Sequence, residues 1–128
     1  MTKSETASPI FFVGGAPRSG TTVTHALVCT SARINAYHAE ISFFTPIIAA
    51  YKTGLHGWEK HTRAFFADRS HFLLHMQRHV NLVMTHVAVA LGQPEIISVK
   101  DPLMTPLFGH VAALLPARAR FITVVRHP

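Results

Sequence analysis

The chain has 128 residues, of which 48% are hydrophobic and 14% are charged. This size fits one domain with a buried core, and the composition excludes a disordered chain. Twelve Lys and Arg residues against six Asp and Glu residues give a net charge of +6, which indicates an anionic partner such as a nucleotide, a nucleic acid or a membrane surface. A single cysteine, Cys29, excludes an internal disulfide and a cysteine-based zinc site. With no visible targeting segment, we expect a cytoplasmic protein.

Short β-branched or aromatic runs alternate with longer helical stretches, which is typical of an α/β protein whose parallel sheet is flanked by helices. We predict four strands, over residues 10–15, 34–39, 95–100 and 120–125. The last two are almost continuous apolar runs, as expected for strands buried on both faces. No linker or internal repeat is visible, so residues 1–128 are read as a single domain.

A helix is expected directly after the first strand, within residues 21–32. It would carry one stripe formed by Val23, Ala26, Leu27 and Thr30. A shorter helix over residues 106–116 would join the third and fourth strands.

A long helical insert separates the second and third strands. Its helices are expected to start at Thr45 and at Asp68 or Ser70, and to stop at Gly54 and Gly92. In the last of them, apolar residues recur at helical spacing and are expected to face the core: Phe72, Met76, Val80, Val83, Val87 and Leu91. Polar residues interrupt the same stretch, so no membrane span is predicted.

Between the first strand and its helix the chain reads VGGAPRSGTT. Gly15 and Gly20 would let backbone N–H groups converge on an anion at the positive end of the helix. The spacing is that of a P-loop, yet Thr21 stands where a nucleoside triphosphatase has its lysine. Arg18 is the cation of this loop, and the fourth strand ends in Arg126 rather than in a carboxylate for magnesium. This pattern favours a phosphosulfate, whose terminal group carries less charge than a terminal phosphate.

Three separated motifs, FVGGAPRSGTT, YHAEISFF and VKDPLMTPLFGHVAALLPARARFITVVRHP, occur in this order and span nearly the whole chain. Together they resemble the sulfotransferases that use 3′-phosphoadenosine 5′-phosphosulfate (PAPS), including the tyrosylprotein sulfotransferases and their bacterial relatives. The first is similar to the family's 5′-phosphosulfate loop, the second to the segment with its proposed general base, and the third to its lysine-aspartate-proline turn and 3′-phosphate motif.

The resemblance implies a role for each matching residue. The 5′-phosphosulfate would be held by Arg18, Ser19, Gly20, Thr21 and Thr22, and the 3′-phosphate would be contacted by Arg126. Glu40 would be the general base, and Lys100 would stabilise the charge that develops near the bridging oxygen. The implied reaction transfers a sulfuryl group from PAPS to an acceptor hydroxyl or amine, with no metal and no nucleic acid involved.

The family continues past this arginine to a 3′-phosphate serine, a further strand and adenine-binding residues, whereas the sequence here stops at VVRHP. The resemblance therefore implies an incomplete domain: a fragment, a truncated gene product or the amino-terminal half of a longer enzyme.

Several residues have a second interpretation. Glu40 could cap a helix that begins near Ser42, and Asp101 is expected to cap the turn that follows it. His25 is expected either near the nucleotide or on the helix surface. His71, His75 and His79 repeat every four residues and could bind a metal ion from one edge of a helix. Such sites usually need a ligand from another element, so no metal is predicted.

Two other functional classes stay open. A nucleotide kinase or triphosphatase shares the loop outline but would bind a magnesium-dependent triphosphate, against which Thr21 argues. An inactive nucleotide-binding or interaction module would instead pair an exposed sheet edge with another chain and form an oligomer.

Overall fold

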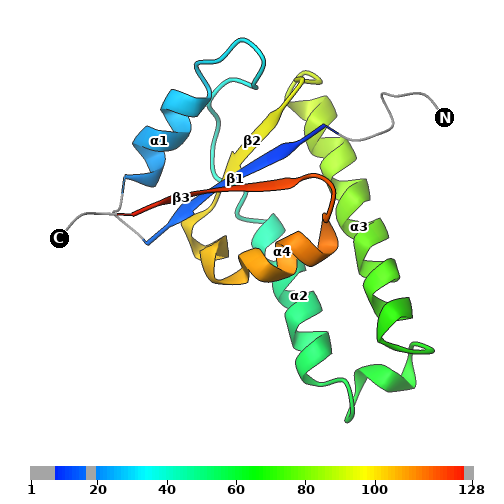
Figure 1. Ribbon diagram of the computed structural model, residues 1–128. Coiled ribbons are helices and arrows are strands. Elements are labelled where there is room, and N and C mark those ends of the chain that lie inside the picture. Colours follow the sequence, from blue (N-terminus) through cyan, green and yellow to red (C-terminus); the bar gives the residue numbers. More distant parts are fainter. Residues whose placement is uncertain (1–7, 17–19, 126–128) are drawn as a thin grey trace.

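The computed structural model describes residues 8–16 and 20–125. These residues form three strands and four α-helices (Figure 1). In order they are β1 (Ile10–Gly15), α1 (Thr21–Val28), α2 (Phe44–His56), α3 (Arg69–Ala90), β2 (Ile97–Lys100), α4 (Phe108–Leu114) and β3 (Ala119–Val124), with 3-10 turns η2 (Thr62–Ala64) and η3 (Pro102–Leu107).

The three strands form one parallel sheet in the order β2-β1-β3. This confirms the predicted α/β class with a parallel sheet flanked by helices, but the predicted count of four strands is wrong. Residues 34–39 form no strand, and their pairing with the sheet is reduced to one bridge between Ile34 and Ile96. Among the described residues no strand pairs with the outer edge of β3, and association through that edge stays a prediction.

The side chain of Asn35 explains the missing strand. Its Oδ1 accepts a hydrogen bond from Ser98 N at 2.7 Å, and its Nδ2 donates to Ser98 O at 3.1 Å. The amide group thus occupies the backbone N–H and C=O of β2 that a fourth strand would have used. The segment runs beside β2 but is held by side chains rather than by a backbone ladder.

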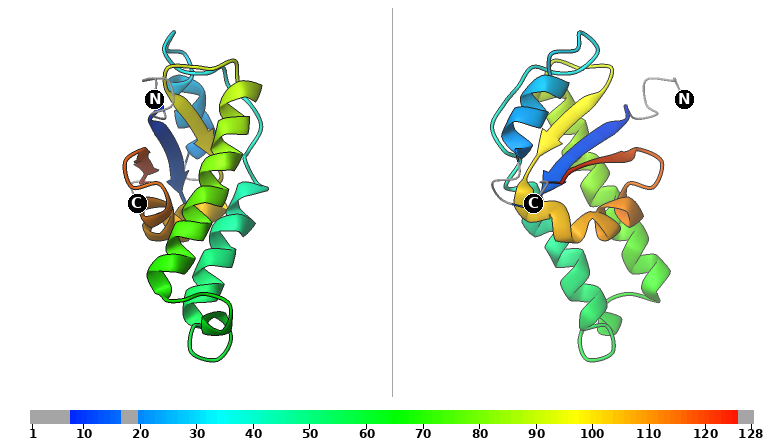
Figure 2. Two further views of the ribbon diagram at one scale, coloured as in Figure 1. Left: turned by 90° about the vertical axis from the view of Figure 1, so that its right-hand side faces the viewer. Right: turned by 60° about the vertical axis from the view of Figure 1, so that its left-hand side comes forward.

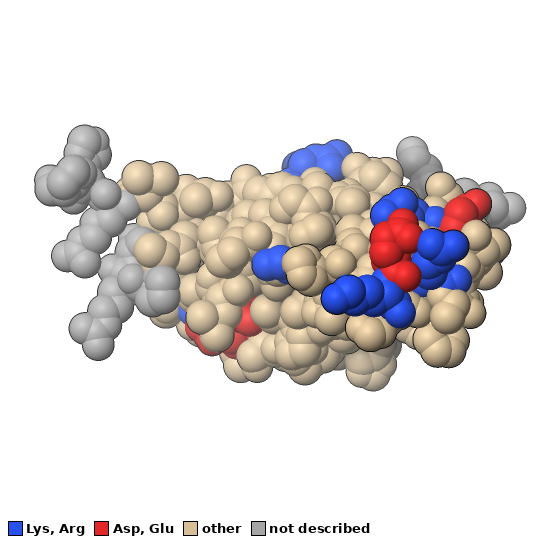
Figure 3. Space-filling model, turned by 90° about the horizontal axis from the view of Figure 1, so that it is seen from below, with Lys and Arg blue, Asp and Glu red and all other residues tan. Residues whose placement is uncertain are grey.

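Helices cover the sheet on both faces (Figure 2). Helix α1 lies on one face, against β1 and β2, and helices α2, α3 and α4 lie on the other. The α2–α3 pair extends past the sheet, and charged side chains gather at one end of the face seen in Figure 3. Glu59, in the α2–α3 connection, forms ion pairs with Arg63 at 2.7 Å and with Arg69 at 3.7 Å.

The core lies between the sheet and the three-helix face. The Phe12 ring stacks on Phe44 at 6.0 Å between ring centroids and on Phe121 at 5.9 Å. Helix α3 begins after Asp68, whose carboxylate accepts a hydrogen bond from His71 N at 2.8 Å as a cap. Its buried residues include four of the six predicted core positions and are Phe72, Met76, Val80, Met84 and Val87.

Other predicted boundaries differ from the structure. Gly54 lies inside α2, where its missing side chain makes room for the ring of Phe72, and the helix ends at His56. On α1 the predicted stripe faces away from the sheet: Val23 is 64% exposed and Leu27 is 66% exposed. The buried side of α1 is formed by Thr21 and His25.

At Gly14, β1 lies close against η3 and α4. A Cβ atom at this position would lie 2.5 Å from Phe108 Cζ and 2.6 Å from Thr105 Oγ1, well inside van der Waals contact. A side chain is therefore excluded unless the layer on that face moves.

Candidate functional site

The candidate site lies where the carboxyl ends of β1 and β2 meet the start of α1, the place where parallel sheets bind ligands. Gly15 has φ of 142° and Gly20 has φ of 95°, both in the region that favours glycine. The predicted loop residues Arg18 and Ser19 lie outside the described residues, as does Arg126. Thr21 and Thr22 form the first turn of α1, with Thr21 buried and Thr22 exposed.

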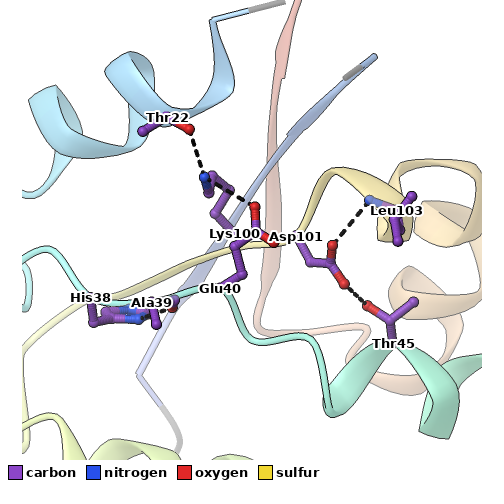
Figure 4. Close-up of polar contacts among 8 residues, drawn as sticks. All are labelled: Thr22, His38, Ala39, Glu40, Thr45, Lys100, Asp101 and Leu103. Atoms are coloured by element: carbon purple, nitrogen blue, oxygen red, sulfur yellow. Dashed lines mark hydrogen bonds and ion pairs between the residues drawn. The ribbon is translucent and has the colours of Figure 1, made fainter. Parts of the chain in front are cut away.

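Lys100 contacts two other predicted site residues, Thr22 and Glu40 (Figure 4). It is the last residue of β2, and its side chain is only 4% exposed. Its Nζ donates to Thr22 Oγ1 at 2.9 Å and forms an ion pair with Glu40 Oε2 at 3.3 Å. A hydroxyl, an ammonium and a carboxylate from three separate segments therefore meet at one point.

Glu40 lies on the segment that runs beside β2. The backbone there is fixed by a hydrogen bond from Ile41 N to Lys100 O at 3.0 Å. The Glu40 side chain is 46% exposed, so its carboxylate remains accessible to solvent although one oxygen faces Lys100. The chemistry open to this pair is proton acceptance by the carboxylate next to a buried positive charge.

Asp101 follows Lys100 but faces other partners, as Figure 4 shows. Its carboxylate accepts hydrogen bonds from Leu103 N at 3.1 Å and from Thr45 Oγ1 at 2.5 Å. The prediction that Asp101 caps the following turn is confirmed. The residue also ties η3 to the first turn of α2.

Sequence reasoning missed Thr105, which anchors the end of β1. Its Oγ1 accepts a hydrogen bond from Gly15 N at 2.9 Å and lies 2.8 Å from Pro102 O, to which it donates. Thr105 precedes Pro106, a pattern that signals only a helix start. Its contact with the glycine loop spans 90 positions in the chain and has no local signal.

His25 is completely buried on the sheet side of α1, so the expectation of a helix-surface side chain is wrong. Its Nε2 donates to Ser98 O at 3.2 Å, and its Nδ1 is buried with no hydrogen-bond partner among the described atoms. Burial lowers the pKa of His25; the nearby His38 and Lys100 lower it further, while the bond to Ser98 O acts in the opposite direction.

The described residues contain no group of three His, Cys, Asp or Glu side chains arranged to hold a metal ion. Along α3 the predicted histidine row packs against aromatic rings instead. His75 lies 4.6 Å from His79 and 5.3 Å from Phe66 between ring centroids, and His71 lies 5.4 Å from Phe66. No helix in residues 8–16 and 20–125 has both the length and the apolar character to cross a membrane.

An open, mostly apolar cavity of about 300 Å³ adjoins the segment that carries Glu40. It reaches across to α3 and is lined by Ile41, Phe43, Val87, Leu91 and Val99 among others. Val99 and Lys100 are consecutive strand residues, so their side chains point to opposite faces of the sheet. The cavity therefore lies on the α3 face, and the Lys100 ammonium on the α1 face.

A comparison with protein-family models gives a match to the family described as the sulfotransferase family, over residues 9–128. A comparison with curated proteins gives no match. The family match includes all the segments that form the candidate site: the glycine loop, α1, the segment carrying Glu40, and β2.

Proposed function

The chain belongs to the sulfotransferase family, and on this premise we propose that it takes a sulfuryl group from PAPS and transfers it to an acceptor hydroxyl or amine. The observation that carries the proposal is the contact of Lys100 Nζ with Thr22 Oγ1 at 2.9 Å and with Glu40 Oε2 at 3.3 Å. It supports a site in which one buried ammonium lies between the start of the anion-binding loop helix and a carboxylate able to act as a base.

The donor set fits a phosphosulfate. Thr21 and Thr22 open α1 after a left-handed Gly20, so backbone N–H groups and hydroxyls are available at the positive end of an eight-residue helix. We assign Arg18, Ser19, Gly20, Thr21 and Thr22 to the 5′-phosphosulfate, and Arg126 to the 3′-phosphate. Lys100 adds a cation that the loop itself lacks at position 21.

In the proposed reaction the acceptor oxygen or nitrogen forms a bond to sulfur while the bond from sulfur to the bridging phosphate oxygen breaks. Glu40 accepts the proton of the acceptor, and Lys100 stabilises the negative charge that grows on the bridging oxygen. The products are the sulfated acceptor and adenosine 3′,5′-bisphosphate. Charge, proton and leaving group are balanced without a metal ion.

Calorimetric titration of the chain with adenosine 3′,5′-bisphosphate and, separately, with magnesium-ATP tests the proposal. We expect the bisphosphate to bind without metal and in preference to magnesium-ATP. Lys100→Met should weaken bisphosphate binding by about tenfold, the equivalent of one lost charge-assisted contact.

Lys52→Met is the matched control, because it removes the same charge from an exposed position on α2 and should leave bisphosphate binding unchanged. Preference for magnesium-ATP would instead favour a kinase or triphosphatase. Equal effects of the two lysine substitutions would remove Lys100 from the site.

A further inference from the structure

The backbone of Ser98 is a meeting point for side chains from two other segments. Ser98 O lies 2.9 Å from His38 Nε2, 3.1 Å from Asn35 Nδ2 and 3.2 Å from His25 Nε2. Ser98 itself is completely buried, two residues before Lys100 on β2. The Ser98–Val99 peptide group, one position before the peptide bond of the candidate lysine, is therefore held from several directions.

A carbonyl oxygen has two lone pairs, so three donors compete for it. His38 also faces a second carbonyl, Ala39 O, at 2.6 Å from its Nδ1. A neutral imidazole has one N–H and can donate to only one of the two carbonyls. Asn35 Nδ2 has two hydrogens and donates to Ala36 O at 3.1 Å as well as to Ser98 O. Among the described atoms, the His25 ring has Ser98 O as its one hydrogen-bond partner.

Helix α1 meets β2 through two successive contacts. Thr22 and His25 are three residues apart and share one side of the helix, while Ser98 and Lys100 are two residues apart and share one face of the sheet. His25 contacts Ser98, and Thr22 contacts Lys100. The histidine contact is the fully buried one and lies one helical turn behind the site.

We propose that His25 is a positioning residue: by donating Nε2–H to Ser98 O, it fixes α1 against β2 and so holds Thr22 within hydrogen-bond distance of Lys100. The expected effect of His25 on turnover rests on the proposed sulfuryl transfer. Its effect on the position of Lys100 can be tested without measuring turnover. Within residues 8–16 and 20–125, the His25 side chain makes no hydrogen bond to Thr21, Thr22, Glu40 or Lys100; its partner is Ser98 O.

Donation to a carbonyl requires a hydrogen on Nε2, and in the neutral imidazole this leaves Nδ1 unprotonated. The lack of a partner for the buried Nδ1 among the described atoms agrees with that tautomer, because a second N–H there would be unsatisfied. Tyr37 at 5.3 Å and His38 at 5.3 Å between ring centroids enclose the imidazole on the other sides.

Two substitutions of His25 distinguish a positioning role from a general effect on the stability of the fold. His25→Leu keeps a side chain of similar size but removes the donor, whereas His25→Gln keeps an N–H donor on a side chain of comparable reach. Loss of the imidazole leaves Ser98 O with Asn35 and also removes the unpartnered Nδ1. Both variants should therefore melt within about 5 °C of the wild type.

The readout is the side-chain ammonium resonance of Lys100 in ¹H–¹⁵N spectra, assigned by its loss in Lys100→Met. In the wild type this resonance should be protected from exchange with water. In His25→Leu we expect exchange to be about tenfold faster, and in His25→Gln within about threefold of the wild type. His56→Leu, at an exposed position at the end of α2, is the matched control and should change nothing.

Turnover gives the second readout, measured as adenosine 3′,5′-bisphosphate released from PAPS. His25→Leu should lower the turnover number about tenfold while the affinity for the bisphosphate stays within about twofold, and His25→Gln should restore it. A lost turnover with an equal loss of affinity would make His25 part of the general fold rather than a positioning residue.

Several results would overturn the proposal. One is a Lys100 resonance in His25→Leu that matches the wild type. Another is a His25 ring that ¹⁵N shifts of the unmodified protein show to be neutral with its hydrogen on Nδ1, a measurement that needs no variant. If the wild type neither binds the bisphosphate nor releases it from PAPS, the sulfuryl-transfer proposal fails, and the Lys100 resonance alone decides the positioning role.

Discussion

The ion pair between Lys100 and Glu40 should respond unequally to the removal of its two charges. Lys100 is 4% exposed at its side chain and Glu40 is 46% exposed. Glu40→Gln leaves a buried ammonium without its counter-charge, whereas Lys100→Met leaves a carboxylate that water can solvate. We therefore expect Glu40→Gln to destabilise the fold more than Lys100→Met does.

Burial sets the magnitude. Breaking a fully buried pair costs about 3–5 kcal/mol, and exposed pairs contribute about 0.2–1 kcal/mol. One partner here is buried and the other half-exposed, so Glu40→Gln should cost about 1–2 kcal/mol of unfolding free energy. Lys100→Met keeps most of the aliphatic volume and should cost about 0.5 kcal/mol or less, and the double variant should resemble Lys100→Met.

Urea unfolding at pH 7 gives the unfolding free energy of the wild type, the two single variants and the double variant. The comparison requires that the dependence of this free energy on urea concentration is the same in all four proteins. A double-mutant cycle then gives the coupling between the two side chains, which we expect to be about 1–2 kcal/mol. The reasoning is refuted if Lys100→Met is the more destabilising change, or if the double variant loses the sum of the two single losses.

Two further changes test groups around the site. Thr105→Val should cost about 1–2 kcal/mol because Gly15 N loses its acceptor, and it should weaken binding of the bisphosphate, while Thr105→Ser should preserve both in urea unfolding and calorimetry. Acidification should destabilise the chain through His25, whose pKa is lowered in the fold mainly by burial, with His38 and Lys100 contributing. The unfolded chain binds the extra proton below its ordinary pKa of 6.5, so unfolding free energy falls as the pH drops through that value, by up to about 1.4 kcal/mol per pH unit. His25→Leu should show a shallower acid dependence in parallel urea titrations at pH 5 to 8, and an unchanged slope would contradict the assignment.

Local patterns were sufficient for much of the fold. Apolar runs bounded by turn residues located β1, β2 and β3, and helical periodicity located the core face of α3. The failure at residues 34–39 has a specific cause, because Asn35 satisfies Ser98 through its side chain and no pattern of apolar residues reports such a bond. The outward stripe of α1 was misleading for a related reason: the inward side uses Thr21 and His25, which are not apolar.

At the candidate site, the residue types were predictable and their connections were not. Glu40 and Lys100 were singled out by their motifs, and the structure brings them to 3.3 Å. Thr105 and His25 act across the sheet, through contacts separated by 90 and 73 positions in the chain. Such contacts depend on how the layers stack, which a single sequence does not encode in any local pattern.

The crowding at Gly14 has an evolutionary consequence. Because the Phe108 ring and Thr105 Oγ1 both occupy the space of a Cβ atom at position 14, the residues at these three positions are not free to vary separately. A homologue that gains alanine or serine at position 14 would be expected to carry smaller side chains at positions 105 and 108. The three positions should therefore covary in an alignment, and a reconstructed ancestor would reveal which of them changed first.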